Sequence, residues 1–417
     1  MSGFELASTI ICLAAGLGYI NARLLRLPSA IALMAMGMLG SFMVVGLNWL
    51  GVISPGWVEG LVARVDFGNV LMHELLGLML FAGALHIDLA ELSANRWSVA
   101  ALALGGTIIS TVLVGVGTYG LMASLRQDIS WGEAFLFGAL ISPTDPIAVL
   151  GILKSAKVPR ELSLQIGGES LFNDGVGVVL FLVIAAVSNG AELGASQIVA
   201  LFAREALGGA LFGFLLGYLG FRLLRSIDDY STEVLITLAL VVGGYASAER
   251  LHVSAPIAAV VAGLVIGNQG RRLAMSDQTR EHVDMFWRLI DEILNAVLFL
   301  MLGLEATRLH WNSIHVVLAA ILVIPVALLA RLLSVATPVS LLRLRRSFAP
   351  HAVKILTWGG LRGGISVALA LSLPPGKAHD VIVLLTYAVV TFSVLVQGLS
   401  LGRLLRHLRQ REDSRVA

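Results

Sequence analysis

Residues 142–146 read Ser-Pro-Thr-Asp-Pro, in the middle of an apolar stretch that runs from 131 to 153. Two prolines three residues apart remove two backbone donors and clash with the preceding turn. The residue before each proline is pushed toward extended backbone. We therefore predict that a helix crosses this stretch and comes undone at Thr144 and Asp145. The alternative is a proline kink whose polar groups only cap the two broken ends.

The composition around this stretch is that of a membrane protein. The chain has 417 residues, of which 57 % are hydrophobic and 13 % are charged, and its mean hydropathy is +0.87. The charged share is about half that of a typical soluble protein. This composition excludes an ordinary soluble enzyme, a disordered protein and a nucleic-acid binder. A single cysteine excludes a disulfide framework and a multi-thiolate metal site.

Apolar runs long enough to cross a bilayer recur along the whole chain. Because strand-like alternation is absent, we predict an all-α polytopic membrane protein of about 13 transmembrane helices. The predicted spans are 4–21, 28–47, 67–87, 97–123, 131–153, 161–187, 197–221, 231–249, 252–268, 288–306, 312–334, 353–373 and 379–402. No loop can hold a folded domain, so we expect one membrane domain over 1–402, a short basic tail over 403–417, and no ATP-using part.

The cations are distributed unevenly between the two sides of these spans. With the C-terminus placed in the cytoplasm, 21 of the 29 Lys and Arg residues fall in cytoplasmic segments, 5 fall outside and three lie within spans. This distribution follows the positive-inside rule. We therefore predict a multi-pass protein of the cell (inner) membrane with its N-terminus outside. Anionic lipid headgroups are the expected partners of the arginine-rich tail.

Polar side chains follow one face of the predicted span 161–187. Ser170 and Asp174 are four residues apart on a helix, and Glu169 and Asn173 form a second such pair beside them. An ionisable residue inside a membrane is costly and indicates function. Carboxylate, hydroxyl and amide oxygens suit a hard cation. The alternative is a hydrogen-bonded seam between two helices.

A third unusual stretch lies in the predicted span 353–373, where four glycines at 359, 360, 363 and 364 surround Arg362. This helix should also be weak or broken. Arg keeps its proton in proteins and needs a buried anion, for which Glu169 and Asp174 are available. The two interrupted spans are seven apart, an offset that predicts an inverted repeat with a midplane site between two broken helices.

Together these motifs resemble the NhaP-like sodium/proton antiporters, the electroneutral branch of the monovalent cation:proton antiporter superfamily. The resemblance rests on Ser-Pro-Thr-Asp-Pro at 142–146, Gly-Glu-Ser-Leu-Phe-Asn-Asp at 168–174 and Gly-Leu-Arg-Gly-Gly at 360–364. It implies an NhaA-like fold with two crossed, unwound helices, and a homodimer. It also implies a mobile core centred on the spans at 97–187 and 312–402, with the remaining spans as the dimerisation scaffold.

The resemblance also implies roles for individual residues. Asp174 would hold either the cation or a proton. Ser170, and Thr144 through its main chain, would be further Na⁺ ligands. Asp145 would compensate the broken helix ends.

Three supporting residues complete the set that the resemblance implies. Asn173 would mark the electroneutral branch, because the electrogenic branch carries a second Asp. Glu169 and Arg362 would form a structural ion pair.

One position departs from the family pattern. The family often carries Glu within Phe-Glu-Gly-Gly-Leu, whereas this chain has Ala82 in Phe-Ala-Gly-Ala-Leu at 81–85. His86, Asp88 or water could replace the missing ligand.

The expected mechanism is competition at one buried carboxylate. Asp174 is neutral when protonated and neutral overall when it holds a cation, so both loaded forms can cross while the empty ionised form is penalised. This predicts electroneutral exchange of Na⁺ or Li⁺ for H⁺ by alternating access, without a cofactor. The alternatives are a K⁺/H⁺ antiporter on the same fold or a proton-uncoupled cation channel. An intramembrane protease is disfavoured, because no His-Glu-x-x-His motif occurs.

Overall fold

The computed structural model describes residues 3–50, 75–145, 149, 153, 160–188, 194–305, 313–344 and 348–416. All regular elements in these ranges are helical, and short π-helical stretches, labelled η, interrupt or extend several α-helices. The first half contains α1 (Gly3–Ile20), η1 (Asn21–Leu25), α2 (Ser29–Trp49), α5 (Leu76–Leu85), α6 (Leu89–Ala94), α7 (Arg96–Ala100), η3 (Ala101–Gly106), α8 (Thr107–Ser124), α9 (Trp131–Ile141) and α11 (Arg160–Ser188). The second half contains α12 (Ala195–Leu224), α13 (Tyr230–Arg250), α14 (Ala255–Val265), η4 (Ile266–Gly270), α15 (Arg271–Leu273), α16 (Asp277–Glu305), α17 (Ile314–Leu342), α18 (Ala352–Trp358), α19 (Gly364–Leu371), α20 (Lys377–Phe392), η6 (Ser393–Gly398) and α21 (Leu399–Val416).

The helices follow the predicted spans closely. Within the described ranges, seven helices are long and apolar enough to cross a membrane, and four shorter apolar helices accompany them. The prediction of an all-α polytopic membrane protein is confirmed at this level. The start of the predicted span 67–87 lies outside the described residues, and its described part is α5. The predicted span 288–306 belongs to a longer helix, because α16 begins at Asp277.

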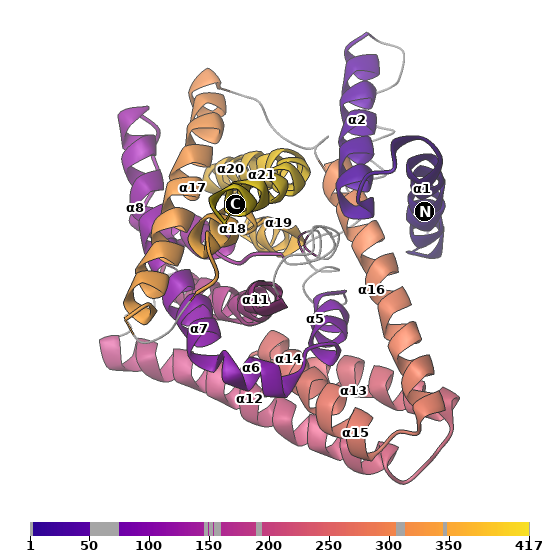
Figure 1. Ribbon diagram of the computed structural model, residues 1–417. Helices are drawn as coiled ribbons and strands as arrows, with labels where there is room; N and C mark the ends of the chain where they lie inside the picture. The colour runs from indigo at the N-terminus through magenta and orange to yellow at the C-terminus, as the bar shows by residue number, and fades with distance from the viewer. Residues whose placement is uncertain are drawn as a thin grey trace.

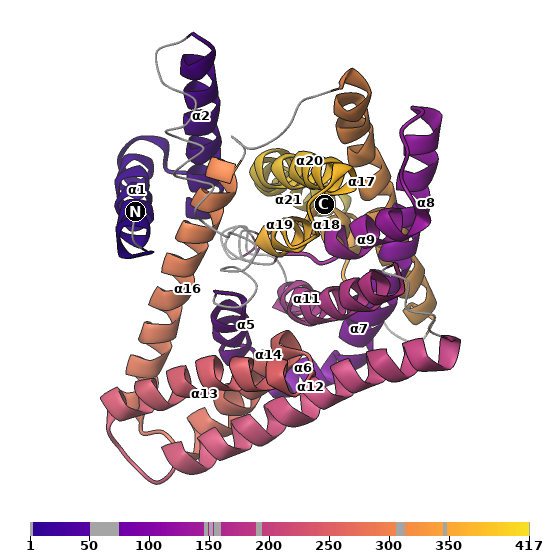
Figure 2. The same ribbon diagram turned by 180° about the vertical axis from the view of Figure 1, so that it is seen from behind.

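The helices form two spatial groups. α12, α13 and α14 pack together, α14 also packs on α5, and α16 runs along α2. Figure 1 shows α1, α2 and α16 on the right and α12 to α15 along the bottom. The other group, with α8, α9, α11 and α17 to α21, occupies the centre and left of the same view, and Figure 2 shows it from behind. The predicted core spans 97–187 and 312–402 supply this second group.

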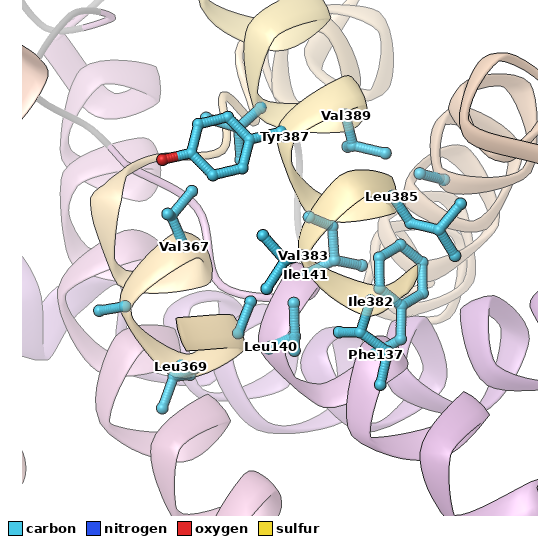
Figure 3. Packing of buried hydrophobic residues seen from close by; sticks show 14 of the residues in the cluster. Phe137, Leu140, Ile141, Val367, Leu369, Ile382, Val383, Leu385, Tyr387 and Val389 are labelled. Atoms are coloured by element: carbon cyan, nitrogen blue, oxygen red, sulfur yellow. The ribbon is translucent and has the colours of Figure 1, made fainter. Parts of the chain in front are cut away.

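A buried apolar cluster holds the short helices α9 and α19 in place. Figure 3 shows Phe137, Leu140 and Ile141 of α9 packed with Val367 of α19 and Ile382 of α20. Each of these side chains is at most 1 % exposed. Because half-length helices leave part of their backbone unpaired, this packing provides the stability that their own length does not.

The chain beyond residue 402 is helical rather than a separate tail. α20, η6 and α21 follow one another without a break from Lys377 to Val416. Leu405 and Leu408 are buried in a cluster with Val335 of α17 and Ile355 of α18. One face of residues 403–408, the first part of the basic segment, therefore packs on the protein, which its charge pattern alone did not indicate.

Both predicted helix breaks are present. α9 ends at Ile141, and residues 142–145 are not helical. α18 ends at Trp358, residues 359–363 are not helical, and α19 begins at Gly364. At the first break, as predicted, proline removes a backbone N–H that a helix would need as a donor. At the second, the glycines leave the backbone free to adopt conformations other than helix. Residues 146–148 lie outside the described part of the chain.

Candidate functional site

The two non-helical segments meet in space. The Asp145 backbone N–H donates to the Leu361 carbonyl oxygen at 2.7 Å. Gly363 allows this approach, because a Cβ at that position would lie 2.5 Å from Asp145 Oδ2. The broken backbone of one helix is thus hydrogen-bonded to the broken backbone of the other, which satisfies groups that helices would otherwise satisfy.

Arg362 binds main-chain oxygens at this junction. Its Nη1 donates to the Pro143 carbonyl oxygen at 2.9 Å and also to the Ser142 carbonyl oxygen. Ser142 caps the C-terminal end of α9, where helix carbonyls lack intrahelical partners and the helix dipole is negative. The guanidinium, which is 3 % exposed, therefore neutralises a helix end.

The prediction that Glu169 pairs with Arg362 is wrong, because the cation that binds Glu169 is a different arginine. Glu169 is instead paired with Arg331 of α17, whose Nη1 and Nη2 donate to the two carboxylate oxygens at 2.5 and 3.1 Å. Arg331 Nη2 also donates to the Leu356 carbonyl oxygen at 3.1 Å. Arg331 can reach both carboxylate oxygens side by side, while Arg362 is already held by carbonyl groups.

Sequence reasoning assigned no role to Arg331. The one available signal was its position, since it is one of three cations within predicted spans and an intramembrane cation needs a partner. Gly360 makes room for it, because a Cβ there would lie 2.4 Å from Arg331 Nε. The glycine-rich motif around Arg362 thus also accommodates Arg331.

Three of the predicted polar residues form one network. The Thr144 backbone N–H donates to Asn173 Oδ1 at 3.2 Å, and Asn173 Nδ2 donates to Thr144 Oγ1 at 2.8 Å. Thr144 Oγ1 and Ser170 Oγ lie 2.9 Å apart and share a hydrogen bond. The Asn173 amide therefore both donates to and accepts from Thr144, which a carboxylate at position 173 could not do.

Asp174 and Asp145 face a cavity of about 650 Å³. Asp174 is 5 % exposed, and within the described ranges no hydrogen bond or ion pair reaches its carboxylate. The same cavity is lined by Asp291 of α16 and Ser366 of α19. Thr144 and Ser170 are not among its lining residues, so the structure brings the predicted site residues together as two adjacent sets, the cavity acids and the hydrogen-bonded network.

The wall formed by α5 carries no carboxylate. Ala82 and His86 line the cavity there, and one ring nitrogen of His86, Nδ1, lies 2.8 Å from the Ala82 carbonyl oxygen. Asp88 is not among the lining residues. It caps α6, where its side chain accepts from the Ala90 and Glu91 backbone N–H groups. Of the two side chains considered as substitutes for the missing Glu, only His86 therefore faces the cavity.

The second unwound segment is held by residues that the sequence did not single out. The Arg362 backbone N–H donates to Ser393 Oγ at 2.9 Å, and Gln397 Nε2 donates to the Trp358 carbonyl oxygen at 3.2 Å. Ser393 and Gln397 belong to the π-helical stretch η6. π-helical insertions often mark functional sites.

Comparisons with known proteins show similarity over nearly the whole chain. The sequence model of the family described as "Sodium/hydrogen exchanger, transmembrane" matches residues 9–407. The chain is 49 % identical to the Na⁺/H⁺ antiporter NhaP of Pseudomonas aeruginosa over 413 residues, covering 97 % of this chain and 96 % of that protein. It is 37 % identical to the Na⁺/H⁺ antiporter NhaH of Halobacillus dabanensis over 397 residues, with 93 % of each protein covered. The structure of the sodium proton antiporter MjNhaP1 from Methanocaldococcus jannaschii superposes with a TM-score of 0.76 and 19 % identity, covering 98 % of this chain and 99 % of that one.

Proposed function

Because this chain belongs to the transmembrane sodium/hydrogen exchanger family, a family of transporters rather than enzymes, we propose that it exchanges Na⁺ or Li⁺ for H⁺ electroneutrally by alternating access. The resemblance to the NhaP-like antiporters that the motifs predict is confirmed. In our proposal the cation and the proton compete for Asp174. No cofactor and no ATP take part, and the transported ions are the substrates.

The observation that supports this proposal most is the position of Asp174. Its carboxylate is buried, faces a cavity and forms no ion pair with a described residue, although Arg288 also lines that cavity. A lone buried negative charge is costly, so the carboxylate is stable only with a proton or a cation bound. Two ligands that cancel the same charge exclude each other, and this exclusion couples their movements.

The motion would expose Asp174 alternately to the two sides of the membrane. The two crossed breaks at 142–145 and 359–363 would move as part of a mobile core centred on 97–187 and 312–402. The remaining spans would form the dimerisation scaffold of a homodimer. We propose about 13 spans, arranged as an inverted repeat in an NhaA-like fold, in the inner membrane with the N-terminus outside.

We propose that Ser170 and the Thr144 main chain provide Na⁺ ligands beside Asp174, and that Asp145 balances the broken helix ends. Support for this comes from the short distances between these residues. Ser170 shares a hydrogen bond with Thr144, which directly precedes Asp145. Asn173 fixes Thr144 from the same face of α11. Hydroxyl and carbonyl oxygens are suitable ligands for a hard monovalent cation.

The test is a proteoliposome assay in which an imposed pH gradient is dissipated by added cation. We expect Na⁺ to dissipate the gradient in the wild type, and Asp174→Asn to abolish this, because Asn neither binds a proton nor carries the charge that a cation cancels. Glu133→Gln is the control, since Glu133 belongs to an exposed capping box at the start of α9. Robust exchange by Asp174→Asn would overturn the assignment.

The same assay distinguishes the alternatives. A larger response to K⁺ than to Na⁺ would favour a K⁺/H⁺ antiporter, an outcome that the missing carboxylate at Ala82 leaves open. Cation flux without proton movement would indicate a channel. Electroneutrality predicts that the Na⁺-driven rate is the same with the membrane potential at zero or imposed across the vesicle wall.

A further inference from the structure

Ser366 is a buried hydroxyl in the cavity wall to which the proposed function gives no role. It lies in the first turn of α19 and is 1 % exposed. Ser366 lines the cavity that Asp174 faces. Its Oγ is buried and, within the described residues, has no hydrogen-bond partner.

Ser366 also lacks the local partner that many helical hydroxyls have. Other buried or half-buried hydroxyls in this chain donate to a carbonyl one turn earlier, as Thr386 Oγ1 does to Ile382 at 2.7 Å and Ser372 Oγ does to Leu369 at 2.8 Å. The residue four positions before Ser366 is Arg362, which lies in the non-helical segment. No hydrogen bond joins Ser366 Oγ to the main chain one turn earlier.

An unsatisfied buried hydroxyl is costly, so a group that persists in this state at a cavity wall is suited to a ligand from the cavity. The carboxylate of Asp174 is likewise buried at the cavity wall without a hydrogen-bond partner in the described part of the chain. Two residues with unpartnered side-chain oxygens, Asp174 of α11 and Ser366 of α19, thus line one cavity, and the Ser366 Oγ atom is buried in its wall.

We propose that Ser366 Oγ is a further ligand for the cation held at Asp174, contributed by the second broken helix. A neutral hydroxyl offers lone pairs to a cation without changing the net charge of the loaded site. Ser366 would raise the affinity for the cation while leaving proton binding at Asp174 almost unaffected. It would therefore shift the competition between the two ions toward the cation.

This inference rests on the proposed function, and the experiment separates the two. Proteoliposomes are prepared with the wild type, Ser366→Ala and Ser366→Thr, and Na⁺-driven proton movement is measured over a range of Na⁺ concentrations. Ser110→Ala is the matched control, because Ser110 Oγ is also buried and without a hydrogen-bond partner among the described residues, but Ser110 does not line the cavity.

We expect Ser366→Ala to raise the half-saturating Na⁺ concentration about three- to tenfold, with the rate at saturating Na⁺ unchanged. Ser366→Thr keeps the hydroxyl and should stay close to the wild type, as should Ser110→Ala. At low Na⁺ the acid limb of the pH profile should shift to higher pH in Ser366→Ala, because protons compete better with a weakened cation, and raising Na⁺ should reverse the shift.

Three outcomes would overturn the inference. One is an unchanged half-saturating concentration in Ser366→Ala. The second is a change equal to that in Ser110→Ala. The third is a lower rate at every Na⁺ concentration without a change in half-saturation, which would indicate a structural role. A wild type that moves no protons in response to Na⁺ would instead refute the proposed function itself.

Discussion

Two arginines are buried beside the same broken helices, and they bind different partners. Arg331 donates two hydrogen bonds to the Glu169 carboxylate, at 2.5 and 3.1 Å. Arg362 donates to the carbonyl oxygens of Ser142 and Pro143. Both residues are at most 5 % exposed. One arginine is thus neutralised by a full negative charge and the other by the partial charges at the end of α9.

This difference shows that the buried core contains two arginines but, among the described residues, only one ion pair between them and a carboxylate. Arg331 and Glu169 form a closed ion pair that contributes no net charge to the site. Arg362 has no ion pair among the described residues and instead stabilises the end of a helix whose last carbonyls lack partners. The first arginine joins α17 to α11, while the second joins the two unwound segments to each other.

The largest effect is expected from removing Arg331. Arg331→Gln leaves the Glu169 carboxylate buried without its cation, and breaking a buried pair in this way costs about 3–5 kcal/mol. We expect a large loss of thermal stability in detergent, measured from the unfolding midpoint of purified protein. Adding Glu169→Gln should restore much of the loss, because the second change removes the uncompensated charge.

A strictly additive double-mutant cycle would contradict the pairing of Arg331 with Glu169. Glu133→Gln combined with Arg331→Gln is the matched control. Glu133 is an exposed acid outside this cluster, so its removal should not rescue the arginine variant.

An intermediate effect is expected at Arg362. Arg362→Gln removes charged donors from the Ser142 and Pro143 carbonyl oxygens but leaves no full buried charge uncompensated, so we expect a loss of about 1.5–3 kcal/mol in total. Stability should fall less than in Arg331→Gln, while exchange activity falls with it, because the two breaks lose one of their links. The measurement is the same unfolding midpoint, together with the Na⁺-driven rate.

The comparison becomes sharper when Arg362→Gln is combined with Glu169→Gln. The coupling energy of this cycle should be clearly smaller than that of the Arg331 and Glu169 cycle, because no direct bond joins Arg362 to Glu169 in the described residues. An equal or larger coupling would restore the pair that the motif resemblance implied.

The sequence predicted the features that local chemistry determines. The breaks at 142–145 and 359–363 follow from prolines and glycines within a few residues, and the polar face of α11 follows from helical spacing. The partner of Glu169 did not follow, because Arg331 is 162 residues away in the chain. Both Arg331 and Arg362 lie in predicted spans, and choosing between them requires knowing which arginine side chain reaches Glu169 of α11 in the folded protein.

Two further elements depend on tertiary structure. η6 places Ser393 next to the Arg362 backbone, although nothing in its apolar sequence marks a π-helical stretch. Ser366 lies just after the second break, and only the packed structure shows that its hydroxyl has no partner among the described residues. Local sequence patterns thus predict where the helices break, and packing determines which side chains form hydrogen bonds with the backbone groups at the breaks.

The smallest effects are expected from two serines, one bonded to the backbone of Arg362 and one bonded to the backbone of Arg331. Ser393 Oγ accepts from the Arg362 N–H at 2.9 Å, and Ser334 Oγ donates to the Arg331 carbonyl oxygen at 3.0 Å. Arg362 lies outside any helix, so Ser393→Ala leaves a buried N–H unsatisfied, at a cost of about 1–3 kcal/mol. Arg331 lies inside α17, where its carbonyl keeps a helical partner, so Ser334→Ala should cost less than about 1 kcal/mol. Thermal unfolding of the two variants side by side tests this order, and equal losses would mean that the Arg362 backbone is as well satisfied as that of an ordinary helical residue.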